Sequence, residues 1–364
     1  MPERLRVALD CMGGDFGASV VLAGAELSLK RVPNLEFCAC GDRTILEPLI
    51  MRRPKLRRLT KVVHSEIEIR MDQKPAEALR IGRSKSSMAL AIDAVKRHEA
   101  HFAVSAGNTG ALMALAKIKL RTIGNIARPA LAGLWPSLKG ETVVLDLGAS
   151  IGADAEHLFN LATMGGAMAR ALLGIDRPTV GLLCSNLGKF DRRQHVHGAD
   201  RLLREAAPQD LRYLGFVEGS DIGSGHVDVV VTEAFAGNIA LKAAEGTAYS
   251  ITNFLQGALR SSWGGRVGYL LSRGSFSMLR NQLRPPNGAM LLGLNGTVRA
   301  RARSSGGAGS DHCRSGPAPC PIRSHGRPLR HGWRGVAVDA GARARIWVDA
   351  RGEGCLVWRL RPAG

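Results

Sequence analysis

Short apolar and β-branched runs alternate with longer stretches of helical periodicity over roughly the first 245 residues of this 364-residue chain. This alternation is typical of a layered α/β fold in which helices cover both faces of a mostly parallel sheet. The sequence predicts strands at 5–9, 35–39, 60–63, 102–104, 143–147, 180–183 and 227–231. It predicts helices at 19–30, 87–97, 110–120, 155–173 and 197–206, several of them after a Gly, Ser or Asn turn.

The composition fits a large globular protein, because 45% of the residues are hydrophobic. No continuous apolar run approaches twenty residues, and the N-terminus enters a strand-like segment without a signal-peptide pattern. We therefore expect a cytoplasmic protein. The seven cysteines form no CxxC pair, which favours reduced thiols used as small core residues over disulfides or a structural metal site.

Positive charge is concentrated in two segments that differ in texture. The formal net charge is +19, and residues 299–364 hold 13 Arg, no Lys and four acidic residues. Such a tail resembles a disordered, nucleic-acid-binding segment. A segment rich in Arg, without Lys and with isolated Trp and Cys, is also the typical product of translating a GC-rich gene in the wrong reading frame. We favour that second interpretation, a frameshift after about Val298, and we expect no nucleic acid partner.

The other basic segment, 246–285, contains no acidic residue and alternates arginines with large apolar side chains. We interpret it as an amphipathic helical hairpin. It can lie on an anionic membrane surface, with Trp263, Leu270, Leu271 and Phe276 as membrane contacts. A basic face packed on the protein or on a dimer partner explains the same pattern, and the sequence does not separate the two.

Four Gly-rich turns follow predicted strands, at 10–15, 105–111, 146–150 and 235–238. Glycine lets the backbone approach an anion closely, and a following helix N-terminus offers free N–H groups. Any one of these turns can be only a tight connection. Four together, each with Asp, Asn or small hydroxyls, predict a phosphate-holding crevice at the carboxyl ends of the strands.

A cluster of cations and hydroxyls at 80–87 could complete a phosphate pocket. The alternative is a helix cap in which Ser86 or Ser87 is the N-cap residue. Motifs for other common chemistries are missing from the sequence: there is no GxGxxG with a distal acidic residue, no GxxxxGK[ST] and no HExxH. Hydride transfer and ATP hydrolysis are therefore disfavoured.

Nine segments in order resemble the PlsX family of acyl-carrier-protein:phosphate acyltransferases: ALDCMGGDFGAS, KPAEALR with SSM, HFAVSAGNTGALMALAK, IARPALAGLWP, KGETVVLDLGA, DAEHLFNLATMG, YLGFVEGSDI, DVVVTEAFAGNIALKAAEG and NGAMLLGLNGTV. The resemblance covers about residues 4–298. It implies a three-layer α/β/α sandwich like that of isocitrate dehydrogenases and phosphotransacetylases, with the basic hairpin protruding from it. It also implies a homodimer without metal or organic cofactor, bound peripherally to the inner face of the cell membrane.

In the implied reaction, inorganic phosphate attacks the thioester of acyl-acyl-carrier protein, and the acyl-phosphate formed feeds a glycerol-3-phosphate acyltransferase of phospholipid synthesis. The site must orient phosphate and stabilise developing negative charge. The resemblance gives catalytic candidates Asn108, Lys242 and Asp146. It gives the phosphate-pocket candidates Gly13, Gly14, Asp15, Ser86, Ser87, Gly107, Thr109, Gly148, Gly237 and Asn238.

The chain departs from the family pattern in four places. Ser150–Ala153 replaces Asn-Val-Asp-Cys, Ala89 replaces an arginine, and 186–193 lacks an acidic pair. The Arg-rich tail replaces a Lys-Ser-His-Gly segment and a closing helix. Three alternatives therefore stay open: an inactive copy of the family, a phosphate acetyl- or butyryltransferase using coenzyme A, and a nucleic-acid binder acting through its tail.

Overall fold

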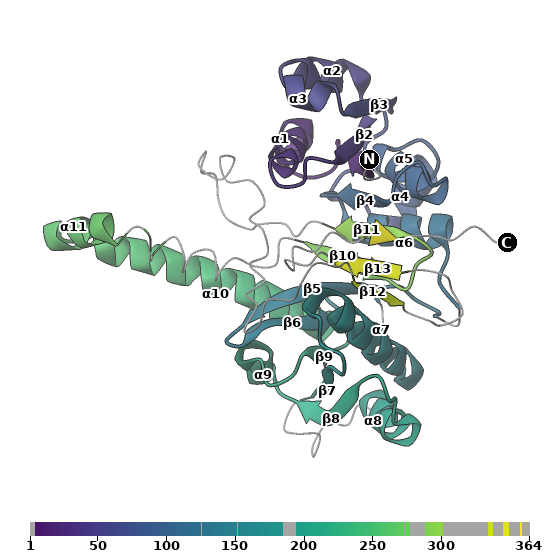
Figure 1. Ribbon diagram of the computed structural model, residues 1–364, viewed down its shortest axis with the longest axis vertical. Coiled ribbons are helices and arrows are strands. Elements are labelled where there is room, and N and C mark those ends of the chain that lie inside the picture. Colours follow the sequence, from purple (N-terminus) through teal and green to yellow (C-terminus); the bar gives the residue numbers. More distant parts are fainter. Residues whose placement is uncertain are drawn as a thin grey trace.

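The computed structural model describes residues 4–124, 126–150, 152–184, 194–272, 274, 276 and 288–300, with three strand segments nearer the C-terminus. An eleven-stranded mixed sheet runs through this part of the chain, and helices cover both of its faces (Figure 1). The strands are β1 Leu5–Asp10, β2 Leu35–Gly41, β3 Thr60–His64, β4 Phe102–Ser105, β5 Ala130–Ser137, β6 Gly140–Leu145, β7 Thr179–Leu183, β8 Arg212–Val217, β9 Val229–Val231, β10 Ala289–Leu292 and β11 Thr297–Ala300.

Eleven helices are described: α1 Gly17–Leu29, α2 Arg43–Met51, α3 Pro54–Arg57, α4 Pro75–Gly82, α5 Ser87–Lys96, α6 Thr109–Leu120, α7 Ala155–Leu173, α8 Gln194–Ala206, α9 Gly219–Ser224, α10 Ala234–Arg260 and α11 Trp263–Leu271. All seven predicted strands and all five predicted helices are present. The predicted α/β sandwich is therefore confirmed. The sequence interpretation missed β5 and β8, and it gave no place in the sheet to β10 and β11.

The sheet consists of two parallel halves that run in opposite directions. Its strand order is β3-β2-β1-β4-β11-β10-β5-β6-β9-β7-β8, and neighbours are parallel except at β11–β10, β10–β5 and β5–β6. The mostly parallel pairing agrees with the sequence prediction. The three antiparallel pairs lie in the middle of the sheet, so they separate the strand ends of the first half from those of the second.

Three apolar clusters hold the layers on the sheet. The largest fully buried side chains are leucines with one methionine and one isoleucine, and burying each contributes roughly 1.5–3 kcal/mol relative to leaving it exposed. They come from all three clusters: Leu22, Leu46 and Leu56; Met88, Ile92, Leu112 and Leu115; and Leu145, Leu158, Leu161, Leu182 and Leu203.

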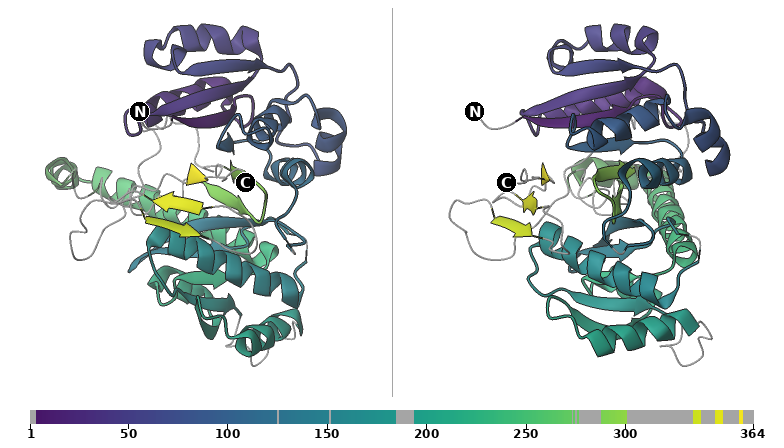
Figure 2. Two further views of the ribbon diagram at one scale, coloured as in Figure 1. Left: turned by 45° about the vertical axis from the view of Figure 1, so that its right-hand side comes forward. Right: turned by 90° about the vertical axis from the view of Figure 1, so that its right-hand side faces the viewer.

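The helix α10 leaves the body of the molecule and carries α11 at its far end (Figures 1 and 2). We call α10 and α11 the arm. The predicted hairpin was 246–285, whereas α10 begins earlier, at Ala234, and breaks at Ser261 and Ser262. All five arginines of the predicted hairpin fall outside the described side chains or residues, as does everything from 277 to 287. The basic hairpin therefore stays a prediction.

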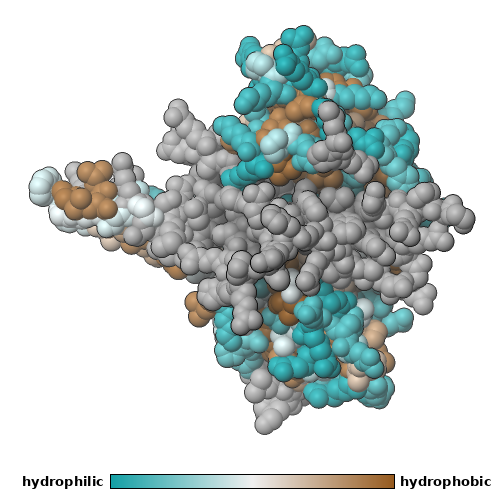
Figure 3. Space-filling view, viewed as in Figure 1, coloured by the Kyte–Doolittle hydropathy of each residue, from teal (hydrophilic) through white to brown (hydrophobic). Residues whose placement is uncertain are grey.

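The arm exposes large apolar side chains toward its tip, which the hydropathy view also shows (Figure 3). Phe254, Trp263 and Leu271 are 76%, 81% and 82% exposed, whereas Leu270 is 56% exposed. Phe276 is half-buried and lies 5.3 Å from Tyr269, ring centroid to ring centroid. Among the described residues no helix is both long and apolar enough to span a bilayer.

The sheet continues two residues past the predicted boundary at 298, because β11 includes Arg299 and Ala300 and pairs with β4 and β10. Beyond it the structure describes β12 Arg334–Ala337, β13 Arg345–Val348 and β14 Val357–Trp358, which form a separate antiparallel sheet. The rest of the Arg-rich tail, with Cys313, Cys320 and Cys355, lies outside the described residues.

Candidate active site

A buried carboxylate, Asp10, organises the first pair of Gly-rich turns at the ends of β1 and β4. Asp10 is 1% exposed, and it accepts hydrogen bonds from the Ser87 hydroxyl at 2.7 Å and the Ser105 hydroxyl at 2.6 Å. Burial raises the pKa of Asp10, and the hydrogen bonds from Ser105, Ser87 and the backbone of Gly13 and Met12 oppose that rise. One side chain thereby links β1, β4 and the start of α5.

Gly13 and Gly14 lie directly against the second turn of this pair. A Cβ on Gly13 would come within 2.6 Å of the Asp10 Oδ2 and 2.9 Å of the Gly107 backbone nitrogen. Gly14 has a φ of +98°, a conformation that L side chains rarely adopt. The two glycines are therefore required for the backbones to meet. Asp15 is exposed on the same turn.

Asn108 caps α6 and ties it to the loop before α4. Its Oδ1 accepts from the Ala111 backbone N–H at 3.0 Å, and its Nδ2 donates to the carbonyl oxygens of Met71 at 3.1 Å and Gln73 at 2.8 Å. Both amide hydrogens are thus used within the protein. The N–H groups of Thr109 and Gly110 have no partner within the helix. The Thr109 residue is half-buried, so its hydroxyl is a further donor at this helix end.

Ser86 and Ser87 are fully buried at the start of α5. Ser86 is the N-cap: its Oγ accepts from the Ala89 N–H at 3.2 Å and donates to the Gly82 carbonyl at 2.7 Å. The Ser87 hydroxyl is engaged by Asp10. The cluster at 80–87 therefore places its two candidate hydroxyls in capping and bridging hydrogen bonds, as in the alternative reading of that segment.

A second buried carboxylate, Asp146, organises the turn that follows β6. Asp146 is 0% exposed. Its oxygens accept from four backbone N–H groups and one hydroxyl, at 2.8–3.2 Å: the N–H groups of Leu131, Gly148, Ala149 and Ser150 and the Oγ of Ser150. This number of donors fixes the turn and leaves little capacity for a substrate.

The predicted turn at 235–238 is instead the first turn of α10, and it packs on the Asp146 turn. A Cβ on Gly237 would overlap the Asp146 carbonyl oxygen, so only glycine lets α10 start here. Gly148, with a φ of +127°, faces the Asn238 side chain. Asn238 is exposed, and Lys242 one turn later is half exposed and pairs with the buried Glu245 at 2.8 Å.

The two pairs of turns lie well apart. Val104 at the end of β4 aligns with Arg299, then with Met290, Ala132 and finally Leu145 at the end of β6. Four strand spacings separate Val104 from Leu145, which is about 19 Å. The structure therefore brings together Gly13, Gly14, Ser87 and Gly107–Thr109, and separately Asp146, Gly148, Gly237 and Asn238. It does not gather all four turns around a single phosphate ion.

Sequence reasoning missed several residues of these networks. Asp10 and Ser105 were quoted only within motifs, although an Asp that ends a buried strand beside a Gly-Gly turn is a signal that could have been used. His157 in α7 is buried, and its Nε2 has no hydrogen-bond partner among the described residues. Burial lowers the pKa of His157, with Asp146 acting in the opposite sense. No sequence pattern indicated that position.

The sequence model of a family described as fatty acid synthesis proteins matches residues 5–309. The chain belongs to this family. It is 51% identical to a phosphate acyltransferase of Nitrobacter hamburgensis over 313 residues, which cover 85% of this chain and 88% of that protein. It is 50% identical to a phosphate acyltransferase of Azorhizobium caulinodans over 367 residues, which cover all of this chain and 97% of the relative.

Solved structures show the same fold at low sequence identity. A phosphotransacetylase from Streptococcus pyogenes superimposes with a TM-score of 0.54 and 17% identity, covering 85% of this chain and 91% of its own. The EutD phosphotransacetylase from Staphylococcus aureus gives a TM-score of 0.52 and 16% identity, covering 82% and 89%. The predicted phosphotransacetylase-like architecture is therefore confirmed.

Proposed function

We propose that this protein transfers a fatty acyl group from acyl-acyl-carrier protein to inorganic phosphate, giving acyl-phosphate for phosphatidic acid and phospholipid synthesis. The observation that carries the proposal is the identity of about half of all aligned residues with phosphate acyltransferases over most of the chain. Three of the glycine-rich turns that suit an anion follow strands in the folded structure, after β1, β4 and β6.

Phosphate binds at the first pair of turns, against the N-terminus of α6. The N–H groups of Thr109 and Gly110 and the hydroxyl of Thr109 are its donors, and the helix dipole favours a dianion there. Asn108 acts as a positioning residue, since both of its amide hydrogens hold the 71–73 loop. Asp10, Ser87 and Ser105 hold the two turns together below the phosphate.

In the reaction, a phosphate oxygen attacks the thioester carbonyl carbon, and the carbonyl oxygen takes the negative charge of a tetrahedral intermediate. The C–S bond then breaks, the electron pair leaves on sulfur as the pantetheine thiolate, and the acyl-phosphate remains. The positive end of the α6 dipole stabilises the developing oxyanion. No covalent acyl-enzyme is required.

The second pair of turns supports the start of α10 in this account. Asp146 fixes the turn, Gly148 and Gly237 let α10 approach it, and Asn238 and Lys242 present a polar, cationic surface to the acidic carrier protein. The charge of Lys242 is partly balanced by Glu245, which makes it a steering group more than a phosphate ligand.

The test of the proposed function uses the purified full-length chain with palmitoyl-acyl-carrier protein and follows the thiol set free, that of the carrier protein or, with coenzyme A esters as donors, that of coenzyme A. Thiol release that requires phosphate, and that falls at least tenfold when acetyl- or butyryl-coenzyme A is the donor, supports it. Preference for the short coenzyme A esters would favour the phosphate acetyl- or butyryltransferase alternative. No release with any donor from a folded protein would indicate an inactive copy.

We propose further that the protein is a homodimer bound peripherally to the inner face of the cell membrane, and the exposed tip of the arm supports the membrane contact. Trp263 and Leu271 are more than four-fifths exposed at its tip, and exposed apolar groups of this size mark interaction sites. The variant Trp263→Ser/Leu271→Ser should lose binding to anionic vesicles, whereas Leu138→Ser, which alters a 91% exposed leucine on the β5–β6 turn, should not. Light scattering of both variants reports whether the dimer persists.

A further inference from the structure

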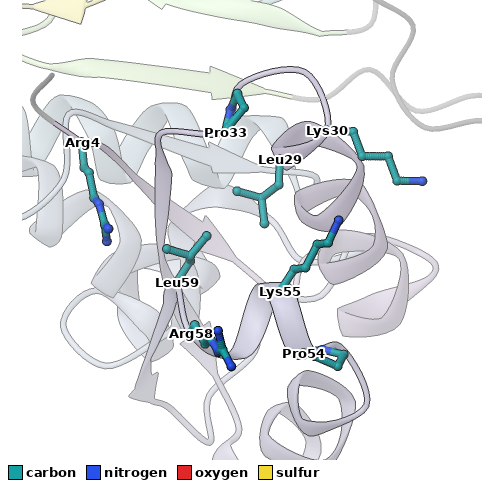
Figure 4. Close-up of a pocket in the computed structure, with 8 residues that line it drawn as sticks. All are labelled: Arg4, Leu29, Lys30, Pro33, Pro54, Lys55, Arg58 and Leu59. Carbon is teal, nitrogen blue, oxygen red and sulfur yellow. The ribbon is translucent and has the colours of Figure 1, made fainter. Parts of the chain in front are cut away.

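A recess at the amino ends of β1, β2 and β3 combines four cations with an apolar floor (Figure 4). We call it the basic basin. Its volume is about 890 Å³, within the range of small-molecule sites. Arg4, Lys30, Lys55 and Arg58 supply the charge, and Leu29, Leu59, Pro33 and Pro54 supply the apolar surface.

Three of the four cations are available to a ligand. Arg4 pairs with Glu36 at 2.6 Å. Within the part of the chain that the structure describes, the side chains of Lys30, Lys55 and Arg58 form no hydrogen bond or ion pair, and all three are exposed. Exposed cations gathered without carboxylates repel one another, so an anion that enters the basin relieves this repulsion.

The surrounding sequence adds to this field. The ten residues 52–61 contain six cations and no acidic residue. One of them, Arg53, is engaged by Glu26 at 3.4 Å and by the Leu49 carbonyl. The nearby carboxylates Glu26 and Glu36 are thus already paired with arginines other than the three free cations, and the net potential over the basin is positive.

The lining decides which kind of anion fits. Three exposed cations around one recess suit a dianionic phosphate, which accepts several charge-assisted hydrogen bonds, better than a single carboxylate. Leu29, Leu59, Pro33 and Pro54 offer no ring on which a nucleobase could stack, and nucleic-acid sites usually provide such rings. They offer instead a surface for aliphatic groups.

We propose that the basic basin binds a phosphate monoester that carries an apolar chain, as in a lipid phosphate. The site is separate from the candidate active site, because β1 runs five residue steps, about 17 Å, from Leu5 beside the basin to Asp10 at the catalytic turn. Its ligand acts as a regulator or an anchor without displacing the substrate phosphate. This inference does not depend on the proposed acyl transfer.

The test is calorimetric binding of dihexanoyl phosphatidic acid, kept below its critical micelle concentration, to the full-length chain. Wild type is compared with Lys30→Gln/Lys55→Gln/Arg58→Gln and with a control of equal charge change, Lys117→Gln/Lys139→Gln/Arg212→Gln, which alters exposed cations elsewhere. We expect the basin variant to weaken binding about tenfold or more and the control to stay within about twofold.

Two comparison ligands identify the chemistry. Dihexanoyl phosphatidylcholine, which has the same chains and no net charge, and inorganic phosphate, which has no chain, should each bind at least tenfold more weakly than the phosphatidic acid. Vesicles with and without phosphatidic acid separate a free ligand from a bilayer headgroup. Weaker binding by the basin variant than by wild type, either to the free ligand or to the vesicles, supports the basin as the binding site. The proposal would be overturned if the basin variant and wild type bound both the free ligand and the vesicles equally well. It would also be overturned if phosphatidylcholine bound as tightly as phosphatidic acid.

Discussion

Asp10 and Asp146 are both buried carboxylates at strand ends beside obligatory glycines, yet they accept hydrogen bonds from different donors. Asp10 relies on two serine hydroxyls with two backbone N–H groups, whereas Asp146 accepts from four backbone N–H groups and one hydroxyl. Side-chain hydroxyls can turn to other partners, but main-chain N–H groups cannot. The comparison indicates that the first half of the sheet keeps an adjustable site and the second half a fixed support.

The largest expected effect comes from removing the carboxylates. Asp146→Ala leaves four backbone N–H groups without this acceptor, two of them buried, and should lower the free energy of unfolding by about 4 kcal/mol. Asp10→Ala should cost about 2 kcal/mol, because the serine hydroxyls can reorient and the cost of burying a charge disappears. Urea denaturation measures both. A larger loss of stability for Asp10→Ala than for Asp146→Ala would contradict the difference between the two carboxylates.

The glycine that contacts Asp146 should be nearly as sensitive. Gly237→Ala forces a Cβ against the Asp146 carbonyl oxygen and should cost about 3 kcal/mol, since backbone must move. Gly246→Ala on the same helix meets nothing within 4 Å and should stabilise by about 0.5–1 kcal/mol. If both substitutions are stabilising in thermal unfolding, α10 does not start as close to the Asp146 turn as described here.

Loss of the Asn108 side chain should affect function more than folding. Asn108→Ala releases the 71–73 loop from the start of α6 and should raise the phosphate KM about tenfold, or about 1.4 kcal/mol. Asn295→Ala removes one hydrogen bond, to the Thr122 carbonyl, on an exposed loop and serves as the control. Unchanged phosphate KM and full acyl-phosphate synthesis in Asn108→Ala would remove this residue from the site.

The smallest expected effect is a pH dependence specific to Asp10. Because its pKa is raised in the folded state, the native protein holds this proton more tightly than the unfolded chain does. The stability of wild type relative to Asp10→Asn should therefore fall as pH rises from about 3.8 through the raised folded pKa, and stay level above it. Urea midpoints across that range check this. If the relative stability of wild type rises with pH, the hydrogen bonds to Asp10 outweigh its burial and its folded pKa is lowered instead of raised.

Periodicity was enough to predict the strands whose runs are buried on both faces, such as Val143–Leu145 and Val229–Val231. It missed β5, which contains Gly133 and Pro136, and gave no place in the sheet to the four-residue β10, because partners far along the chain define these strands. Three of the four Gly-rich turns were correctly placed after strands, whereas 235–238 is the first turn of the helix α10. Their division into two pairs depends on the antiparallel middle of the sheet, and nothing local in the sequence encodes that reversal.

The central claim is that phosphate binds at the first pair of turns and not at the second. Steady-state synthesis of acyl-phosphate at varied phosphate tests it with two variants, Thr109→Val at the first pair and Asn238→Ala at the second. Phosphate binding at the first pair predicts a phosphate KM about tenfold higher for Thr109→Val and within about twofold of wild type for Asn238→Ala. The reverse result, with Asn238→Ala raising the phosphate KM and Thr109→Val leaving it unchanged, would contradict it.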